Sequence, residues 1–219
     1  MFKKDKDKKE VVVFLGLKTT GKDYNSQVYL KNGYKKVALA DPLRSMLWSI
    51  LEFYPSRFTI EYNKFKNIEF NANIWGKLFN FIPFFKRIGI TTVRKMLQNL
   101  GSEMKILFGE DFWAKQWCEH VEDVLVNTKY NVVCTDCRFP VEVKKALSLT
   151  RKGYKVKFIW ICYKNADFKE ILKDKHESEA LAQYLYYNRE KYGLTDGTEI
   201  SNKKMKDMLK DYENDIYKI

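Results

Sequence analysis

The chain has no run of about 18 consecutive apolar residues, the length that a membrane-spanning helix needs, so we expect no membrane partner. The opening stretch, MFKKDKDKKE, is charged and lacks the apolar segment of a secretion signal. We expect it to be a frayed lead-in to the first strand and the protein to be cytoplasmic. Internal repeats and low-complexity linkers are also missing. For 219 residues this favours a single domain, with or without an inserted subdomain.

Cysteine is scarce, with four in the chain. Only Cys134 and Cys137 have the C-x-x-C spacing that zinc and redox sites use. A structural zinc site needs two further ligands at suitable spacing, and none is evident. We therefore interpret these cysteines as buried or unpaired thiols.

A long block of basic residues is absent as well, although the net charge is +12, with 40 Lys and Arg against 28 Asp and Glu. Such a charge suits a nucleic-acid-binding protein. It would equally draw small anionic substrates into a cleft by its long-range field. The charge alone does not choose between these two classes.

The clearest motif that is present is VVVFLGLKTTGKD, residues 11–23. Its apolar run, Val11–Leu15, predicts a buried strand. The spacing from Gly16 through Gly21 to Lys22 is that of a P-loop, whose inward-facing amides and following helix dipole hold phosphates. Lys22 would then reach the outermost phosphate groups as a point charge. The predicted phosphate loop consists of Gly16, Leu17, Lys18, Thr19, Thr20, Gly21, Lys22 and Asp23.

One position of this loop departs from the general pattern. The residue after the lysine is usually Ser or Thr, whose hydroxyl binds Mg²⁺, and here it is Asp23.

Helix and strand patterns alternate after the loop. A helix from about 21 to 31 should place Tyr24 and Val28 on its inner face, and Asn32-Gly33 should stop it. The alternation predicts an α/β fold with a mainly parallel five-stranded sheet between helices. The strands are expected near residues 11–15, 37–40, 131–135, 155–162 and 198–201.

Polar residues follow two of these strands, at the edge where open α/β sheets place ligands. Asp41 is either the cap of a helix that begins with Pro42 or a site residue. Asp136 follows the third strand, where an acid beside a P-loop strand commonly holds Mg²⁺ or its waters. Arg138 could grip a phosphate with its fork of donors. A structural Asp–Arg pair is the alternative.

The stretch 55–90 is rich in aromatic residues and shows no clear strand pattern. We interpret it as an inserted helical subdomain or a mobile cover, within a helical acceptor-binding insert over residues 53–127, and its aromatics would form a small second core or stack on a base. After it, Arg94 and Gln98 lie one helical turn apart and can point at one ligand. Gly101 is expected to interrupt or end their helix.

Residues 164–179 are polar and rich in lysine, as expected of a lid that carries positive charge. His176 and Glu179 are candidate site residues there. Ser178 could equally be a cap of the helix predicted over 178–191.

Taken together, these motifs resemble the phage-type deoxynucleoside monophosphate kinases, a family of P-loop nucleoside monophosphate kinases. The resemblance covers most of the chain, and in that family Asp does follow the P-loop lysine. The matching blocks, in the family's order, are GLKTTGKD, ADPLR, RKMLQNLGSE, GEDFW, VVCTDCRFPVE, HESE and EISN.

The resemblance implies a three-layer kinase fold and transfer of the ATP γ-phosphate to a deoxynucleoside 5′-monophosphate, with Mg²⁺. Lys22, Asp136 and Arg138 would be catalytic, and Asp23 and Asp136 would organise the metal or its waters. His176 and Glu179 would lie near the lid. Because residues 164–175 contain no Arg, the lid role could pass to Lys164, Lys169 or Arg189. The acceptor side would be lined by Asp41, Arg44, Arg94, Gln98, Arg138 and Glu142.

Two other functions stay open. Animal-type phosphomevalonate kinases also resemble the GKD loop and the ADPL block, although the LQ-x-LG and D-x-RFP-x-E blocks favour the nucleotide kinase. A nucleic-acid-binding protein with a relic or regulatory P-loop would bind DNA or RNA tightly and in a salt-sensitive way. We expect ATP and a deoxynucleoside monophosphate as partners and no stable nucleic-acid partner, and a homodimer stays open.

Overall fold

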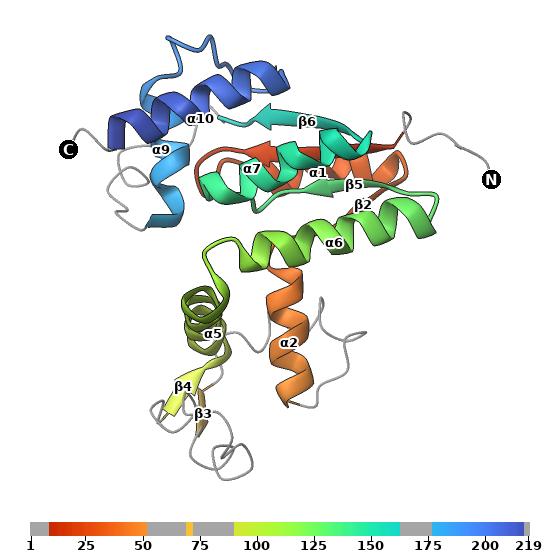
Figure 1. Ribbon diagram of the computed structural model, residues 1–219, viewed down its shortest axis with the longest axis vertical. Helices are drawn as coiled ribbons and strands as arrows, with labels where there is room; N and C mark the ends of the chain where they lie inside the picture. Colours follow the sequence, from red (N-terminus) through yellow and green to blue (C-terminus); the bar gives the residue numbers. More distant parts are fainter. Residues whose placement is uncertain (1–8, 52–68, 72–89, 163–176, 217–219) are drawn as a thin grey trace. The chain divides into compact units, whose positions relative to one another are not determined.

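The computed structural model describes residues 9–51, 69–71, 90–162 and 177–216 (Figure 1). The chain divides into two compact units. The first consists of Met1–Leu39 and Ala114–Ile219, and the second of Ala40–Trp113.

A five-stranded sheet forms the middle of the first unit, in the order β2–β5–β1–β6–β7 (Figure 1). The central strand, β1 (Glu10–Leu15), is parallel to β5 (Asn131–Cys134) and β6 (Lys155–Trp160). At the edges, β2 (Tyr34–Lys36) is parallel to β5, whereas β7 (Thr198–Ile200) is antiparallel to β6. The predicted α/β class with a mainly parallel five-stranded sheet is therefore confirmed.

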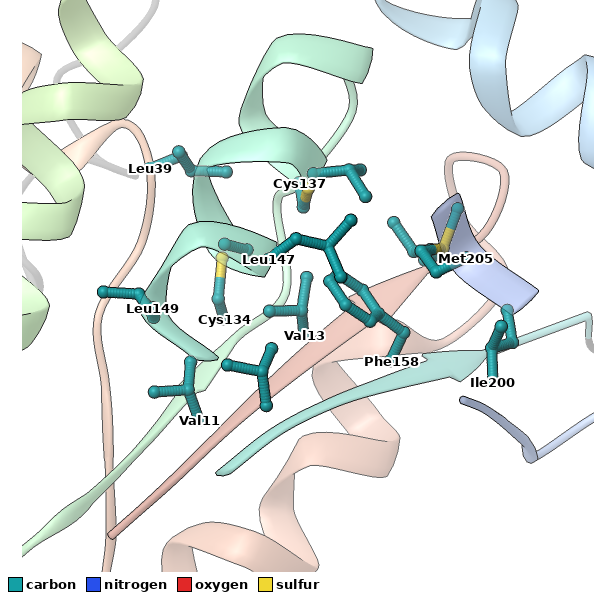
Figure 2. Close-up of a cluster of buried hydrophobic side chains, with 14 of the residues drawn as sticks. Val11, Val13, Leu39, Cys134, Cys137, Leu147, Leu149, Phe158, Ile200 and Met205 are labelled. Atoms are coloured by element: carbon teal, nitrogen blue, oxygen red, sulfur yellow. The ribbon is translucent and has the colours of Figure 1, made fainter. Parts of the chain in front are cut away.

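The larger core covers one face of this sheet. Because side chains alternate along a strand, Val11, Val13 and Leu15 of β1 share that face. Figure 2 shows Val11 and Val13 among side chains from neighbouring elements, including Leu147 and Phe158. The helices that contribute to this core are α6 (Phe112–Asn127), α7 (Pro140–Ser148), α9 (Ala180–Tyr187) and α10 (Asn202–Ile216).

The smaller core covers the opposite face, where Val12 and Phe14 of β1 meet α1 (Lys22–Lys31). The placement of Tyr24 and Val28 on the inner face of this helix was wrong, since they are 82% and 56% exposed. The inner face consists instead of Ser26, Tyr29 and Leu30. Tyr29 makes edge-to-face contacts with Phe14 and Tyr34, at centroid distances of 5.6 and 5.1 Å, and these contacts fix which side of α1 faces the sheet.

The second strand lies three residues earlier than the predicted 37–40, at Tyr34–Lys36. The apolar residues Val37 to Leu39 are buried as predicted. The Val37 amide still donates to Val133 O of β5 at 3.0 Å, but side chains bond to two further backbone groups of this segment. The Trp117 indole donates to Val37 O at 3.0 Å, and Leu39 N donates to Oδ1 of Asp136 at 2.8 Å. The strand ends where these bonds replace the ladder.

The second unit contains α2 (Asp41–Leu51), α5 (Val93–Phe108) and a two-stranded antiparallel sheet. That sheet pairs β3 (Glu69–Asn71) with β4 (Ile90–Thr92), in a stretch for which the sequence showed no strand pattern. Most of the aromatic-rich stretch 55–90 lies outside the described residues.

The prediction that Gly101 interrupts or ends its helix was wrong, because α5 continues through it to Phe108. A glycine inside a helix costs only about 1 kcal/mol relative to alanine, which is too little to end a helix by itself. Trp113 donates its indole N–H to Gly101 O at 3.0 Å, and a Cβ at position 101 would lie 3.4 Å from Leu43 Cδ2.

Among the described residues, no helix is both long enough and apolar enough to cross a membrane.

Candidate phosphate-binding site

The phosphate loop, Gly16 to Asp23, connects the end of β1 to the start of α1. Gly16 has φ +146°, and a Cβ there would lie 2.2 Å from the carbonyl oxygen of Ile161, so the loop passes against the end of β6. Gly21 has φ +85° and forms the N-cap of α1. Thr19 also has positive φ, at 62°, which is strained for a β-branched residue and is typical of functional loops. The predicted strand–loop–helix arrangement is therefore present.

Lys22, the first residue of α1, turns its ammonium group back into the loop. Its Nζ donates to Gly16 O at 2.7 Å and to Leu17 O at 2.5 Å. The pKa of Lys22 is lowered to about 8, first by burial and then by the positive charge of Arg138. The carboxylates that oppose this shift belong to Glu179, Asp23 and Asp136. At neutral pH the loop therefore contains a mostly protonated cation at the N-terminus of a helix.

Asp23 lies in the first turn of α1 and has two described partners. Its Oδ1 accepts a hydrogen bond of 2.7 Å from the hydroxyl of Thr135, which directly follows β5. The same oxygen forms an ion pair with Lys36 Nζ at 2.5 Å. Burial raises the pKa of Asp23, but the bonds from Lys36 and Thr135 outweigh it, and the net pKa is lowered. The side chain remains 74% exposed, so this carboxylate is ionised and open to a ligand.

Asp136 follows Thr135 and accepts from Leu39 N at 2.8 Å and from the Cys134 thiol at 3.3 Å. Its oxygens, with those of Asp23 and Thr135, are the hard donors that Mg²⁺ prefers, and Mg²⁺ commonly uses one or two carboxylates together with phosphate and water. Across the parts of the chain that the structure describes, no group of three or more His, Cys, Asp or Glu could hold a metal.

The thiols beside this edge are inert. Cys134 and Cys137 are free and buried, and burial raises the pKa of each well above its ordinary value. Their interpretation as buried thiols is confirmed.

Arg138 lies in the loop between β5 and α7, and Glu142 lies in the first turn of α7. The carboxylate of Glu142 accepts from the amides of Arg138, at 2.7 Å, and Phe139, at 3.0 Å, so it caps the N-terminus of α7. The Arg138 side chain is 45% exposed.

Glu179 brings a third segment to the site. It ends η5 (Glu177–Glu179), directly before α9, which is shorter than the helix predicted over 178–191. Its Oε1 accepts from Arg138 Nη1 at 2.8 Å and its Oε2 from the Lys18 amide at 3.0 Å. The Ser178 hydroxyl lies 3.4 Å from the same Arg138 nitrogen. Glu179 is therefore part of the phosphate-loop surroundings.

Of the remaining lid candidates, the structure describes only Arg189. His176, Lys164 and Lys169 lie outside the described residues. Arg189 stacks over the Tyr186 ring, with its guanidinium carbon 4.5 Å from the ring centroid, and donates to Tyr186 O at 2.9 Å. These contacts hold Arg189 against Tyr186, in the turn that follows α9.

The predicted acceptor residues Asp41, Arg44, Arg94 and Gln98 belong to the second unit. Asp41 is the first residue of α2, and Oδ1 of Asp41 pairs with Arg44 Nη1 at 3.1 Å. The helix begins one position earlier than the predicted cap implied, because Arg44 N bonds to Ala40 O. Arg94 and Gln98 are both in α5, and Gln98 is exposed.

Sequence reasoning missed two residues of this site, Thr135 and Lys36. A signal for Thr135 was present, because the loop carries Asp23 where a hydroxyl is usual and a hydroxyl-bearing residue precedes Asp136. Lys36 gave no such signal, since its contact with Asp23 depends on where β2 ends.

No protein-family model matches the chain, and no curated protein matches it. The chemistry of the site therefore rests on its own geometry. A helix N-terminus, a partly buried ammonium, a half-exposed arginine and two acidic side chains at the carboxyl ends of the strands suit the binding of a polyphosphate with a divalent cation.

Proposed function

We propose that the protein is a kinase that transfers the γ-phosphate of ATP to a deoxynucleoside 5′-monophosphate. The observation that carries the proposal is the loop from Gly16 to Asp23, with left-handed Gly21 and the Lys22 ammonium at the start of α1. In phosphoryl transfer little covalent chemistry is left to the protein, so positioning and charge neutralisation dominate. This loop provides both for a triphosphate.

The roles of the residues follow from their charges. The loop amides and Lys22 bind the β- and γ-phosphates of ATP, and Arg138 neutralises charge that develops on the transferred group. Asp23, Thr135 and Asp136 would hold Mg²⁺ or its waters, and the ion would supply further charge neutralisation when bound. Each of these groups lies at the carboxyl ends of β1 and β5, which are neighbouring strands.

The identity of the acceptor rests on the resemblance of the sequence blocks to the nucleotide kinases. Asp41, Arg44, Arg94 and Gln98 would bind the monophosphate, with Arg suited to its phosphate and Gln to a base edge. Glu142 caps α7 and would act on the acceptor side through Arg138.

The test is an acceptor panel. Purified full-length protein, ATP and Mg²⁺ are incubated with each deoxy- and ribonucleoside monophosphate, and ADP formation is followed. Phosphomevalonate belongs in the panel, because the GKD loop and the ADPL block leave that acceptor open. Phosphorylation of one or more deoxynucleoside monophosphates is expected. The proposal would be rejected if phosphomevalonate were the only acceptor that is phosphorylated, or if none of the acceptors in the panel were phosphorylated.

A further inference from the structure

A single buried carboxylate joins three segments that are far apart in the sequence. Glu179 is 3% exposed and precedes α9. One of its oxygens bonds to Arg138, after β5, and the other to the amide of Lys18, in the phosphate loop. The last pair is separated by 161 positions in the chain.

The burial of Glu179 indicates a fixed arrangement. A buried carboxylate is costly unless charged or hydrogen-bonding partners compensate it, and here each oxygen has a donor. Because the guanidinium is a rigid plane with five N–H donors, a bond to one of its nitrogens also restrains the others. The Arg138 side chain stays 45% exposed, so part of that restrained plane remains accessible to a ligand.

We propose that Glu179 is a positioning residue for triphosphate binding, which holds the Arg138 guanidinium at a set orientation relative to the backbone of the phosphate loop. The identity of the ligand as a triphosphate rests on the proposed function. Glu179 itself does not contact the phosphate, since a carboxylate would repel it. Its effect on binding therefore passes through Arg138 and through the Lys18 amide.

A double-mutant cycle tests this coupling. The variants are Glu179→Gln, which keeps the size and removes the charge, Arg138→Ala, and the two combined. A matched control is Glu122→Gln, which removes a carboxylate of the same unit whose partner, Lys152, precedes β6 and so lies at the amino ends of the strands, opposite the phosphate loop. The probes are Mg²⁺–ATP and inorganic triphosphate, measured by calorimetry, with kcat and KM for any acceptor that is turned over.

Glu179→Gln is expected to weaken binding of both probes about tenfold in the natural background and less than about threefold in the Arg138→Ala background. Glu122→Gln should leave both affinities unchanged. Equal losses of affinity in the two backgrounds would show a merely structural role and overturn the inference. Wild-type affinity in Glu179→Gln would also overturn it.

Circular dichroism and thermal melting precede the binding experiments. If Glu179→Gln does not fold, Glu179→Asp takes its place in the same cycle. This variant keeps the charge on a side chain one methylene shorter and should give an intermediate loss of affinity.

If the wild-type protein binds neither probe, the inference and the proposed function fail together. If it phosphorylates an acceptor and Glu179→Gln does so equally well, only the inference fails. If it binds triphosphate without turnover, the proposed function fails and the binding cycle still decides the role of Glu179.

Discussion

The hydroxyl of Thr135 donates a hydrogen bond of 2.7 Å to Oδ1 of Asp23, and so connects the residue after β5 to the first turn of α1. In the usual P-loop arrangement the hydroxyl belongs to the loop and the acid to the neighbouring strand end. Here Asp23 provides an acid in the loop and Thr135 provides a hydroxyl at the strand end, which also retains the acid of Asp136. Asp23 and Thr135 thus exchange the usual places of hydroxyl and acid, while a second acid remains at the strand end.

This exchange predicts the effect of Thr135→Val, which removes the hydroxyl with little change of volume. Loss of a group that orients a metal-binding carboxylate typically weakens metal binding 10- to 100-fold, and we expect about a tenfold loss for Mn²⁺ in the presence of ATP. Electron paramagnetic resonance of the bound Mn²⁺ measures it. Thr150→Val is the control, because it removes a hydroxyl that bonds only to Leu147 O among described partners. Equal affinities in the two variants would contradict the prediction.

Lys22→Ala should lower phosphoryl transfer at least about a hundredfold while the fold is retained, because it removes a preorganised cation from the phosphate loop. Lys31→Ala removes the same charge from the other end of α1, where the side chain is exposed, and should leave turnover nearly unchanged. Steady-state kinetics of both variants measure these two effects on turnover. Near-normal turnover of Lys22→Ala would be incompatible with a kinase that uses this loop.

Binding of ATP should weaken as the pH rises from 7 to 9. The pKa of Lys22 is lowered to about 8, and the protonated form is the one that attracts phosphate. A bound triphosphate favours the ammonium, so the complex should take up a proton above pH 8. Calorimetry in buffers of different ionisation enthalpy measures this uptake. Lys22→Arg should lose this pH dependence, since guanidinium stays charged; an unchanged dependence would assign the titration to another group.

Gly16→Ala should destabilise the protein strongly, because the added Cβ would lie 2.2 Å from the Ile161 carbonyl oxygen. We expect a loss of about 3 kcal/mol or more in the free energy of unfolding. Gly33→Ala separates the clash from the backbone conformation, since Gly33 also has positive φ but has nothing within 4 Å of its Cβ position. It should cost about 1–2 kcal/mol. Urea unfolding of both variants compares them, and equal losses would rule out the clash.

Arg94→Ala and Gln98→Ala should fail in different ways. Loss of Arg94 should weaken every monophosphate acceptor alike, because all acceptors carry the phosphate. Loss of Gln98 should change the preference among bases, by about 1–3 kcal/mol for a lost buried hydrogen bond in the complex. Kinetics against the panel of deoxynucleoside monophosphates measure both. If neither variant changes KM or kcat for any acceptor, α5 is scaffold.

The sequence was most informative where the signal is local. The apolar run Val11–Leu15 and the spacing of Gly16, Gly21 and Lys22 predicted a strand, a loop and a helix, and the structure has them in that order. These features depend on neighbouring residues alone. The alternation of elements likewise predicted the sheet class, because parallel strands need helical crossovers.

Features that depend on distant partners were not predictable in this way. The inner face of α1 is set by Tyr29 against Phe14 and Tyr34, which no periodicity within the helix reveals. The end of β2 is set by Trp117, 80 positions away from Val37. In the same way, nothing near Glu179 in the sequence indicates its bond to the Lys18 amide.

The bond between Glu179 and the Lys18 amide also sets an order of events during synthesis of the chain. A ribosome makes the phosphate loop early and reaches Glu179 only 161 residues after Lys18. At about 5–20 residues per second, the loop exists for roughly 8–30 s on the growing chain before its carboxylate partner has been synthesised. A nascent chain that extends past Arg138 but not yet to Glu179 therefore has Arg138 without the contact that restrains it. The arrangement around the loop is completed only when the segment before α9 has left the ribosome.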